Sequence, residues 1–181
     1  MRIVSGTFGG RRFNPPAGIP ARPTTELARE GLFNMLGNQI DFDGLKTLDL
    51  FAGTGSISYE LASRGAAELW LVERDPTSVQ FIDKTATALG ISEKLHVIRN
   101  DAFKFLKSTA ETYGLIFSDP PYALQNMDEL PKLVFEKKML MPGGIFVMEH
   151  THRNDYQKHP YFQRIKNYGT TVFSFFIQPN E

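Results

Sequence analysis

The stretch from Ser118 to Tyr122 reads SDPPY and has the residue types best suited to chemistry in this sequence. It follows the apolar run 115–117, so Asp119 is predicted to lie where a buried strand ends, the edge at which open α/β sheets bind ligands. Consecutive prolines stiffen the loop and leave its carbonyls as acceptors. The candidate catalytic residues Asp119, Pro120, Pro121 and Tyr122 could hold a planar ring that carries an amino group. We interpret this ring as a nucleobase.

A second candidate site is the glycine-rich segment DLFAGTG, from Asp49 to Gly55. Gly53 and Gly55 allow a tight turn and let a ligand lie against bare backbone at the start of a helix. A dinucleotide fingerprint needs another glycine three residues later, but Ser58 stands there, which argues against NAD. An aspartate at the strand end suits an ammonium group instead, because an ammonium pairs with a carboxylate and a diphosphate does not.

Two more acidic residues follow the next two predicted strands. Glu73 could accept both ribose hydroxyls of an adenosine, although it could also be a surface charge. Asp101 could accept from an adenine amino group or cap the helix that follows it, and the two roles are compatible. Together with the glycine loop, these strand-end acids describe a site for S-adenosylmethionine. The predicted cofactor-binding residues are Asp49, Phe51, Gly53, Gly55, Glu73, Asp101 and Ala102.

The two sites together imply methyl transfer to an exocyclic amine. The lone pair of such a nitrogen is delocalised into the base ring, which makes it a poor nucleophile. Hydrogen bonds from the amino hydrogens to Asp119 and to the Pro120 carbonyl would direct the lone pair toward the sulfonium methyl group, and positioning supplies most of such a rate. Asp119 could in addition remove the proton. The base must be unstacked to be reached, with Tyr122 as the stacking face.

Short apolar strands alternate with helices from residue 46 onward. Strands are expected at 46–50, 68–73, 96–98, 115–118 and 144–149, and helices at 56–64, 77–89, 102–109 and 127–138, the last interrupted near Pro131. This alternation predicts a mostly parallel sheet covered on both faces. Two β-rich runs, 162–166 and 170–177, have no helix between them and must pair antiparallel. The predicted fold is an α/β, Rossmann-like class I methyltransferase fold with a mostly parallel seven-stranded sheet and an antiparallel C-terminal hairpin.

An N-terminal extension, residues 1–40, is predicted to precede the methyltransferase domain, residues 41–181. It contains a β-hairpin around Gly9-Gly10, a proline-rich connector, and a helix capped by Thr24 or Thr25 and ended by Gly37. Residues 1–24 carry arginines and no acidic residue, although the chain as a whole is neutral. A concentrated basic arm can bind phosphates, and the alternative is a solvated, flexible terminus.

Composition excludes several classes of protein. The 181-residue chain has no cysteine, which rules out a disulfide scaffold and a thiolate zinc site, and its four histidines lack metal-ligand spacing. No apolar run approaches the roughly 20 residues that span a bilayer. The start lacks the apolar core of a secretion signal. We expect a cytoplasmic protein without a membrane or metal partner, and a monomer, because no coiled-coil pattern is present.

Residues 1 to about 122 resemble a known family. The segments MRIVSGTFGGRRF, RPTTELAREGLFNML, LDLFAGTGSISYELASRGA and SDPPY are together similar to the RsmD-type methyltransferases, which make N2-methylguanine in 16S ribosomal RNA of the small subunit. The resemblance implies S-adenosylmethionine as methyl donor, a basic hairpin near the RNA, and ribosomal RNA within a small-subunit particle as partner. Its implied substrate-binding residues are Arg2, Arg11, Arg12, Arg22, Thr24 and Arg29.

Two other functions are compatible with parts of the sequence. A DNA adenine-N6 methyltransferase could use the SDPPY chemistry, but the chain leaves no room for a domain that reads DNA in the major groove. A non-catalytic RNA-binding module could use the same basic arm. Such a module would be expected to have an eroded cofactor loop, and the loop here is intact.

Overall fold

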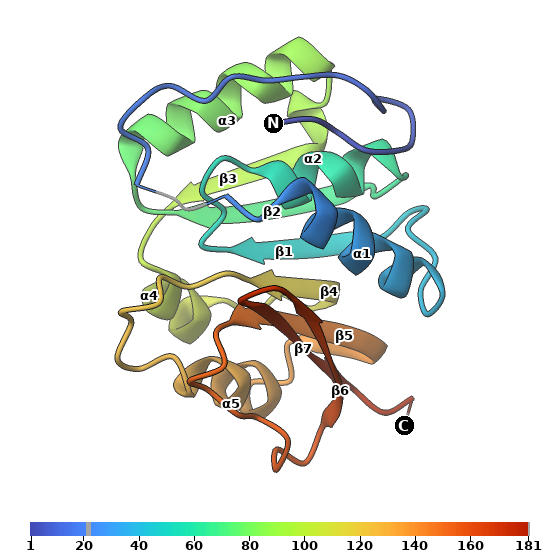
Figure 1. The fold of residues 1–181 in the computed structure, drawn as a ribbon, viewed down its shortest axis with the longest axis vertical. Helices are drawn as coiled ribbons and strands as arrows, with labels where there is room; N and C mark the ends of the chain where they lie inside the picture. The colour runs from blue at the N-terminus through green and yellow to red at the C-terminus, as the bar shows by residue number, and fades with distance from the viewer. Residues whose placement is uncertain (21–22, 181) are drawn as a thin grey trace.

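A computed structural model describes residues 1–20 and 23–180, and its centre is a seven-stranded sheet with helices on both faces (Figure 1). The strand order is β3-β2-β1-β4-β5-β7-β6. The strands are β1 (Lys46–Leu50), β2 (Glu68–Glu73), β3 (Leu95–Arg99), β4 (Tyr113–Ser118), β5 (Leu140–His150), β6 (Phe162–Tyr168) and β7 (Thr171–Ile177). The pairs among β1 to β5 are parallel, whereas β7 pairs antiparallel with both β5 and β6. The predicted sheet and its C-terminal hairpin are confirmed.

The helices divide between the two faces of the sheet. Helices α1 (Glu26–Gly37), α2 (Ser56–Ser63) and α3 (Pro76–Leu89) contribute to one hydrophobic cluster, and α4 (Ala102–Ser108) and α5 (Glu129–Glu136) to another. Because successive side chains of a strand point to opposite faces, Leu115 and Phe117 pack in the first cluster and Ile116 in the second. A short 3₁₀-helix, Ser92–Lys94, precedes β3. Among the described residues, no helix is long and apolar enough to span a membrane.

One helix prediction was wrong in its detail. The expected interruption at Pro131 does not occur, because α5 begins at Glu129 rather than at residue 127. Pro131 therefore lies in the first turn, where the backbone nitrogen has no partner inside the helix in any case. Strand β5 begins at Leu140 instead of the predicted residue 144, so Pro142 and Gly143 lie within it, where the pairing with β4 shifts register after Tyr113.

The N-terminal segment forms the predicted hairpin and packs on the rest of the chain. Residues 1–13, which we call the N-terminal arm, are joined by a bridge between Arg2 and Arg12 and by a hydrogen bond of 2.9 Å from the Ile3 amide to the Arg11 carbonyl. Figure 1 shows the arm crossing α2 and α3. Ile3 and the inner face of α1 join the hydrophobic cluster of α2 and α3. The extension thus shares a core with the sheet, and the division at residue 40 stays a prediction.

Candidate active site

A cavity of about 390 Å³ lies at the carboxyl ends of the central strands, a volume typical of small-molecule sites. Its lining combines the two sets of residues that were predicted separately from the sequence. From the cofactor set it includes Asp49, Phe51, Gly53, Glu73, Asp101 and Ala102, and from the catalytic loop Asp119, Pro120, Pro121 and Tyr122. Thr24, from the connector before α1, lies in the same wall.

The glycine loop between β1 and α2 has an unusual backbone. Phe51 has a φ of 58°, a left-handed conformation that is uncommon outside glycine and often marks a ligand site. Gly53 and Gly55 also have positive φ. A Cβ on Gly55 would lie only 2.5 Å from the Tyr59 hydroxyl oxygen, so glycine is required there by the packing of α2. Gly55 does not itself line the cavity but lies between Thr54 and Ser56, which do, and its assignment to the cofactor site stays a prediction.

Asp49 presents a buried carboxylate to this cavity. It is 2% exposed, and the Ser58 hydroxyl donates a hydrogen bond of 2.9 Å to its Oδ2 atom. The pKa of Asp49 is raised to about 7, mainly by burial; the hydrogen bond from Ser58 opposes this rise, and the nearby charge of Glu73 adds a smaller contribution to it. A bound cation would stabilise the charged form. Sequence reasoning used Ser58 only to argue against NAD and missed that it orients this carboxylate.

The carboxylates that follow β2 and β3 are both held by backbone amides. Glu73 accepts hydrogen bonds from the amides of Gly53, at 2.7 Å, and Asp75, at 3.0 Å. These bonds tie the glycine loop to β2 and fix the carboxylate in the cavity wall. Asp101 caps α4, because its Oδ1 atom accepts from the amides of Phe103 and Lys104. The cap predicted from the sequence is present and uses one of its two oxygens.

The SDPPY loop continues directly from β4 and is anchored on both sides. The Asp119 amide donates to the Leu50 carbonyl at 3.4 Å, which extends the pairing of β4 with β1 into the loop. Farther along, the Tyr156 hydroxyl donates to Asp128 at 2.8 Å and ties the end of the loop to the segment after β5. Tyr122 lines the cavity and is 39% exposed.

The predicted substrate-binding arginines have different environments. Arg2 forms an ion pair with Glu26, and Arg12 is exposed. Arg11 donates to the Ala88 carbonyl at 3.0 Å and so caps the end of α3. Arg22 lies outside the described residues.

Two other predicted substrate contacts lie in the interior. Arg29 is 3% exposed, and its Nε atom lies 3.8 Å from Glu60, so it has no surface for a phosphate; this part of the prediction is not supported. Thr24 is 8% exposed and donates to Glu149 at 2.7 Å. No group of three potential metal ligands occurs in residues 1–20 or 23–180.

Comparison with known proteins decides the family. A family model described as conserved hypothetical protein 95 matches residues 1–177. YlbH of Bacillus subtilis (strain 168), which carries a provisional rRNA methyltransferase name, is 39% identical over 153 residues, covering 83% of this chain and 82% of YlbH. Ribosomal RNA small subunit methyltransferase D of Escherichia coli (strain K12) is 32% identical over 150 residues, covering 82% of this chain and 74% of that protein. The chain belongs to the RsmD-type methyltransferase family.

Solved structures agree with this membership. The Escherichia coli protein yhhF, which carries a provisional methyltransferase name, superposes with a TM-score of 0.87 at 26% identity, and the match covers 100% of this chain and 99% of that one. An RNA methyltransferase from Salinibacter ruber, solved in complex with S-adenosyl-L-homocysteine, shares the fold with a TM-score of 0.68 at 20% identity over 88% of this chain and 95% of that one. The predicted class I methyltransferase fold is confirmed.

Proposed function

We propose that this chain transfers a methyl group from S-adenosylmethionine to the exocyclic N2 amine of a guanine in small-subunit ribosomal RNA. The observation that carries the proposal is the single cavity that joins the strand-end acids and glycine loop to the SDPPY loop. The names of the relatives support ribosomal RNA as the substrate, and the resemblance of the sequence to RsmD-type enzymes supports guanine N2.

The residues of the cavity fit the methyl donor. Asp49 offers a desolvated carboxylate for the ammonium group of the donor, and Glu73 is oriented to accept from ribose hydroxyls. Asp101 lies beside the apolar atoms of Ala102 and Phe103, which suit an adenine ring. When bound, S-adenosylmethionine supplies an electrophilic methyl group on a sulfonium sulfur. Buried lining residues such as Asp49, Ala102 and Phe117 would limit the access of water to that group.

The SDPPY loop positions the acceptor amine. We assign the two amino hydrogens to the Asp119 carboxylate and to the Pro120 carbonyl, which leaves the nitrogen lone pair directed away from both acceptors. The bound donor would supply the methyl group and would leave as the neutral thioether, and the nitrogen would release one of these hydrogens as a proton to the Asp119 carboxylate or to water. The exposed ring of Tyr122 supplies a stacking surface for a base that has been turned out of its strand.

The proposed substrate is an assembled particle rather than naked RNA. The chain carries no net charge, Arg11 already caps the end of α3, and the ion pair with Glu26 partly neutralises Arg2, whose side chain is still 36% exposed. Sequence-independent RNA affinity depends on cations that neutralise phosphates, so this chain has few to offer. Ribosomal proteins would supply further contacts. We propose that the chain acts as a monomer in the cytoplasm.

The decisive experiment is incubation with a labelled methyl donor and either ribosomal RNA, small-subunit particles or DNA, followed by nucleoside analysis. We expect label in N2-methylguanine, with particles as the best substrate. Label in adenine would favour the DNA adenine-N6 methyltransferase, and no label in any arm would favour a binding module.

A substitution in the loop tests the mechanism. Asp119→Ala is expected to retain donor binding but to lower the rate of methyl transfer at least about a hundredfold, because one of the two amine acceptors is lost. Asp83→Ala, which removes an exposed carboxylate of α3, is the matched control and should leave the rate unchanged. Turnover of Asp119→Ala near the wild-type rate would show that the loop does not position the amine as proposed.

A further inference from the structure

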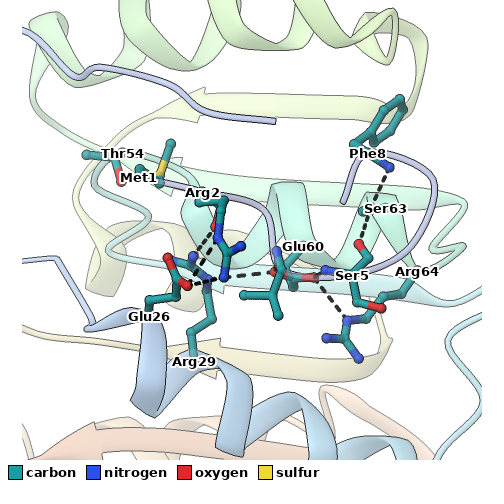
Figure 2. Close-up of polar contacts among 11 residues, drawn as sticks. Met1, Arg2, Ser5, Phe8, Glu26, Arg29, Thr54, Glu60, Ser63 and Arg64 are labelled. Carbon is teal, nitrogen blue, oxygen red and sulfur yellow. Dashed lines mark hydrogen bonds and ion pairs between the residues drawn. The ribbon is translucent and has the colours of Figure 1, made fainter. Parts of the chain in front are cut away.

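Glu60, in the middle of α2, is completely buried beneath the N-terminal arm (Figure 2). Its Oε1 atom accepts a hydrogen bond of 2.8 Å from the Val4 amide, and its Oε2 atom accepts one of 3.1 Å from the Ser5 amide. One carboxylate therefore binds two consecutive backbone groups of the arm. Such a contact fixes the position and the direction of the chain, because both oxygens are used at once.

Two arginines complete the surroundings of this carboxylate. The Arg64 Nε atom donates to Glu60 at 3.1 Å, and the Arg29 Nε atom lies 3.8 Å away. Arg29 also donates through Nη2 to the backbone carbonyl of Arg2, so it holds the arm directly. Buried ion pairs of this kind gain little net stability over apolar packing, but loss of one partner is costly because a buried charge is left behind. The buried cluster of Glu60, Arg29 and Arg64 is therefore better explained by its contacts with the N-terminal arm than by a contribution to stability.

Helix α2, which contains Glu60, directly follows the glycine loop that we assign to the methyl donor, and we call this loop the donor loop. Gly55 is the N-cap of α2, and Thr54, in the cavity wall, donates through its hydroxyl to the Met1 sulfur at 3.7 Å. At the other end of α2, the Ser63 side chain accepts from the Phe8 amide at 2.9 Å. The arm is therefore attached to α2 from its last turn to the donor loop, as Figure 2 shows for the labelled residues. A shift of the arm on α2 changes its distance from the cavity.

Fixing the arm also fixes its outward-facing arginines. Arg2 and Arg12 are directly opposite in the antiparallel bridge, so their side chains project from the same side of the arm. Ile3, the next residue, faces the other way and is 2% exposed. The contacts of Glu60 with residues 4 and 5 begin only two positions after Arg2. They set where this pair of cations lies relative to the donor loop.

We propose that Glu60 is a positioning residue for the RNA substrate. Its buried carboxylate holds the N-terminal arm on α2, so that Arg2 and Arg12 meet the RNA at a set distance from the cavity. This inference rests on the proposed function. Glu60 itself does not touch the RNA, the methyl donor or the reacting atoms.

The test is Glu60→Gln, assayed with small-subunit particles and labelled methyl donor. Hydrogen exchange at the Val4 and Ser5 amides is expected to speed up. If the arm then occupies its docked position only about a tenth of the time, KM for the particles rises about tenfold, because the apparent affinity falls with the competent fraction. We expect kcat to stay within about twofold of wild type, because the arm is docked once the RNA is bound. The Kd of the methyl donor should also stay within about twofold, because Glu60 does not line the cavity.

Two further variants separate positioning from stability. Glu60→Asp keeps the charge but shortens the side chain, so its KM should fall between wild type and Glu60→Gln; it also serves if Glu60→Gln does not fold. Val134→Ala removes buried volume in α5, in the opposite hydrophobic cluster, and controls for lost stability alone. It should lower the melting temperature without changing KM.

Several results would overturn the inference. These are unchanged amide exchange in Glu60→Gln, unchanged KM despite faster exchange, a fall in kcat alone, or a KM rise of equal size in Val134→Ala. Each of these leaves the proposed function intact if wild-type protein methylates guanine. If the wild-type protein methylates no guanine, the proposed function fails instead, and amide exchange still reports whether Glu60 holds the arm.

Discussion

Replacing Asp49 by asparagine removes the buried, titratable carboxylate that lines the proposed donor site. Burial raises the pKa of Asp49 from 3.8 to about 7. The folded chain therefore keeps this proton up to about pH 7, whereas the unfolded chain loses it near its ordinary value. Between the two values the folded state binds more protons, so the free energy of unfolding falls as pH rises and levels off above about pH 7.

The size of this effect follows from the same pKa. The full rise corresponds to roughly 4 kcal/mol of stability that is present below the unfolded pKa and lost by about pH 7. From pH 5 to pH 7 the loss is roughly 2 kcal/mol, because Asp49 is only half ionised at a pH equal to its folded pKa. Asparagine does not titrate, and its amide oxygen can still accept from the Ser58 hydroxyl. The stability of Asp49→Asn relative to wild type should therefore increase by that amount over this pH range.

Urea unfolding of both proteins without ligand, at intervals from pH 5 to pH 8, measures the difference directly, because all other titrating groups are shared. Binding of the methyl donor gives a second measurement. Because the proposed partner of the ammonium group is the ionised carboxylate, wild-type affinity should rise with pH up to about 7, and Asp49→Asn should bind weakly at every pH. Stability curves that run parallel across this range would refute the assignment of a raised pKa to Asp49.

Two further predictions test the glycine loop and the arm. Gly55→Ala forces a left-handed φ of 83° on alanine and brings its Cβ to 2.5 Å from the Tyr59 hydroxyl, so it should cost about 2 kcal/mol or more in urea unfolding. Gly90→Ala, with a φ of 71° and nothing within 4 Å of the added atom, incurs only the backbone term and is the matched control. Arg12→Ala should raise KM for small-subunit particles more at low salt than at high salt, because fewer counterions are released on binding.

The controls define what would contradict these two predictions. Equal stability losses in Gly55→Ala and Gly90→Ala would mean that Tyr59 moves aside and that no close contact enforces glycine at position 55. For the arm, Lys107→Ala removes an exposed cation from the C-terminal end of α4 and should leave KM unchanged. A KM for Arg12→Ala that equals wild type at every salt concentration would exclude Arg12 as a phosphate contact.

Most of the fold and the location of the site could be predicted from local sequence pattern. The alternation of strands and helices identifies a parallel sheet, and connections within such a sheet bring the carboxyl ends of its strands to one edge. Asp49, Glu73, Asp101 and Asp119 each lie within two residues of the carboxyl end of a strand, so their meeting in one cavity follows from topology. No side-chain contact had to be known to predict it.

The roles of the charged residues could not be predicted in the same way. Glu60 and Arg64 are four residues apart on a helix, a spacing typical of an exposed ion pair. In the structure Glu60 is buried by residues 56 positions earlier in the chain. Arg29 is buried by the same arm, and it forms part of the interior instead of the basic surface that the sequence indicated. Nothing in the local pattern around these residues signals either burial.

The sequence by itself determined the order of strands and helices along the chain, the glycine loop proposed to bind the methyl donor, and the chemistry available to the SDPPY loop, because each depends on residues close together in the chain. Only the tertiary structure decided which charges are free to meet RNA and which hold the arm, and that Asp49 keeps its proton to about pH 7. Desolvation is the reason. It depends on everything packed around a group, and most of that packing comes from distant parts of the chain.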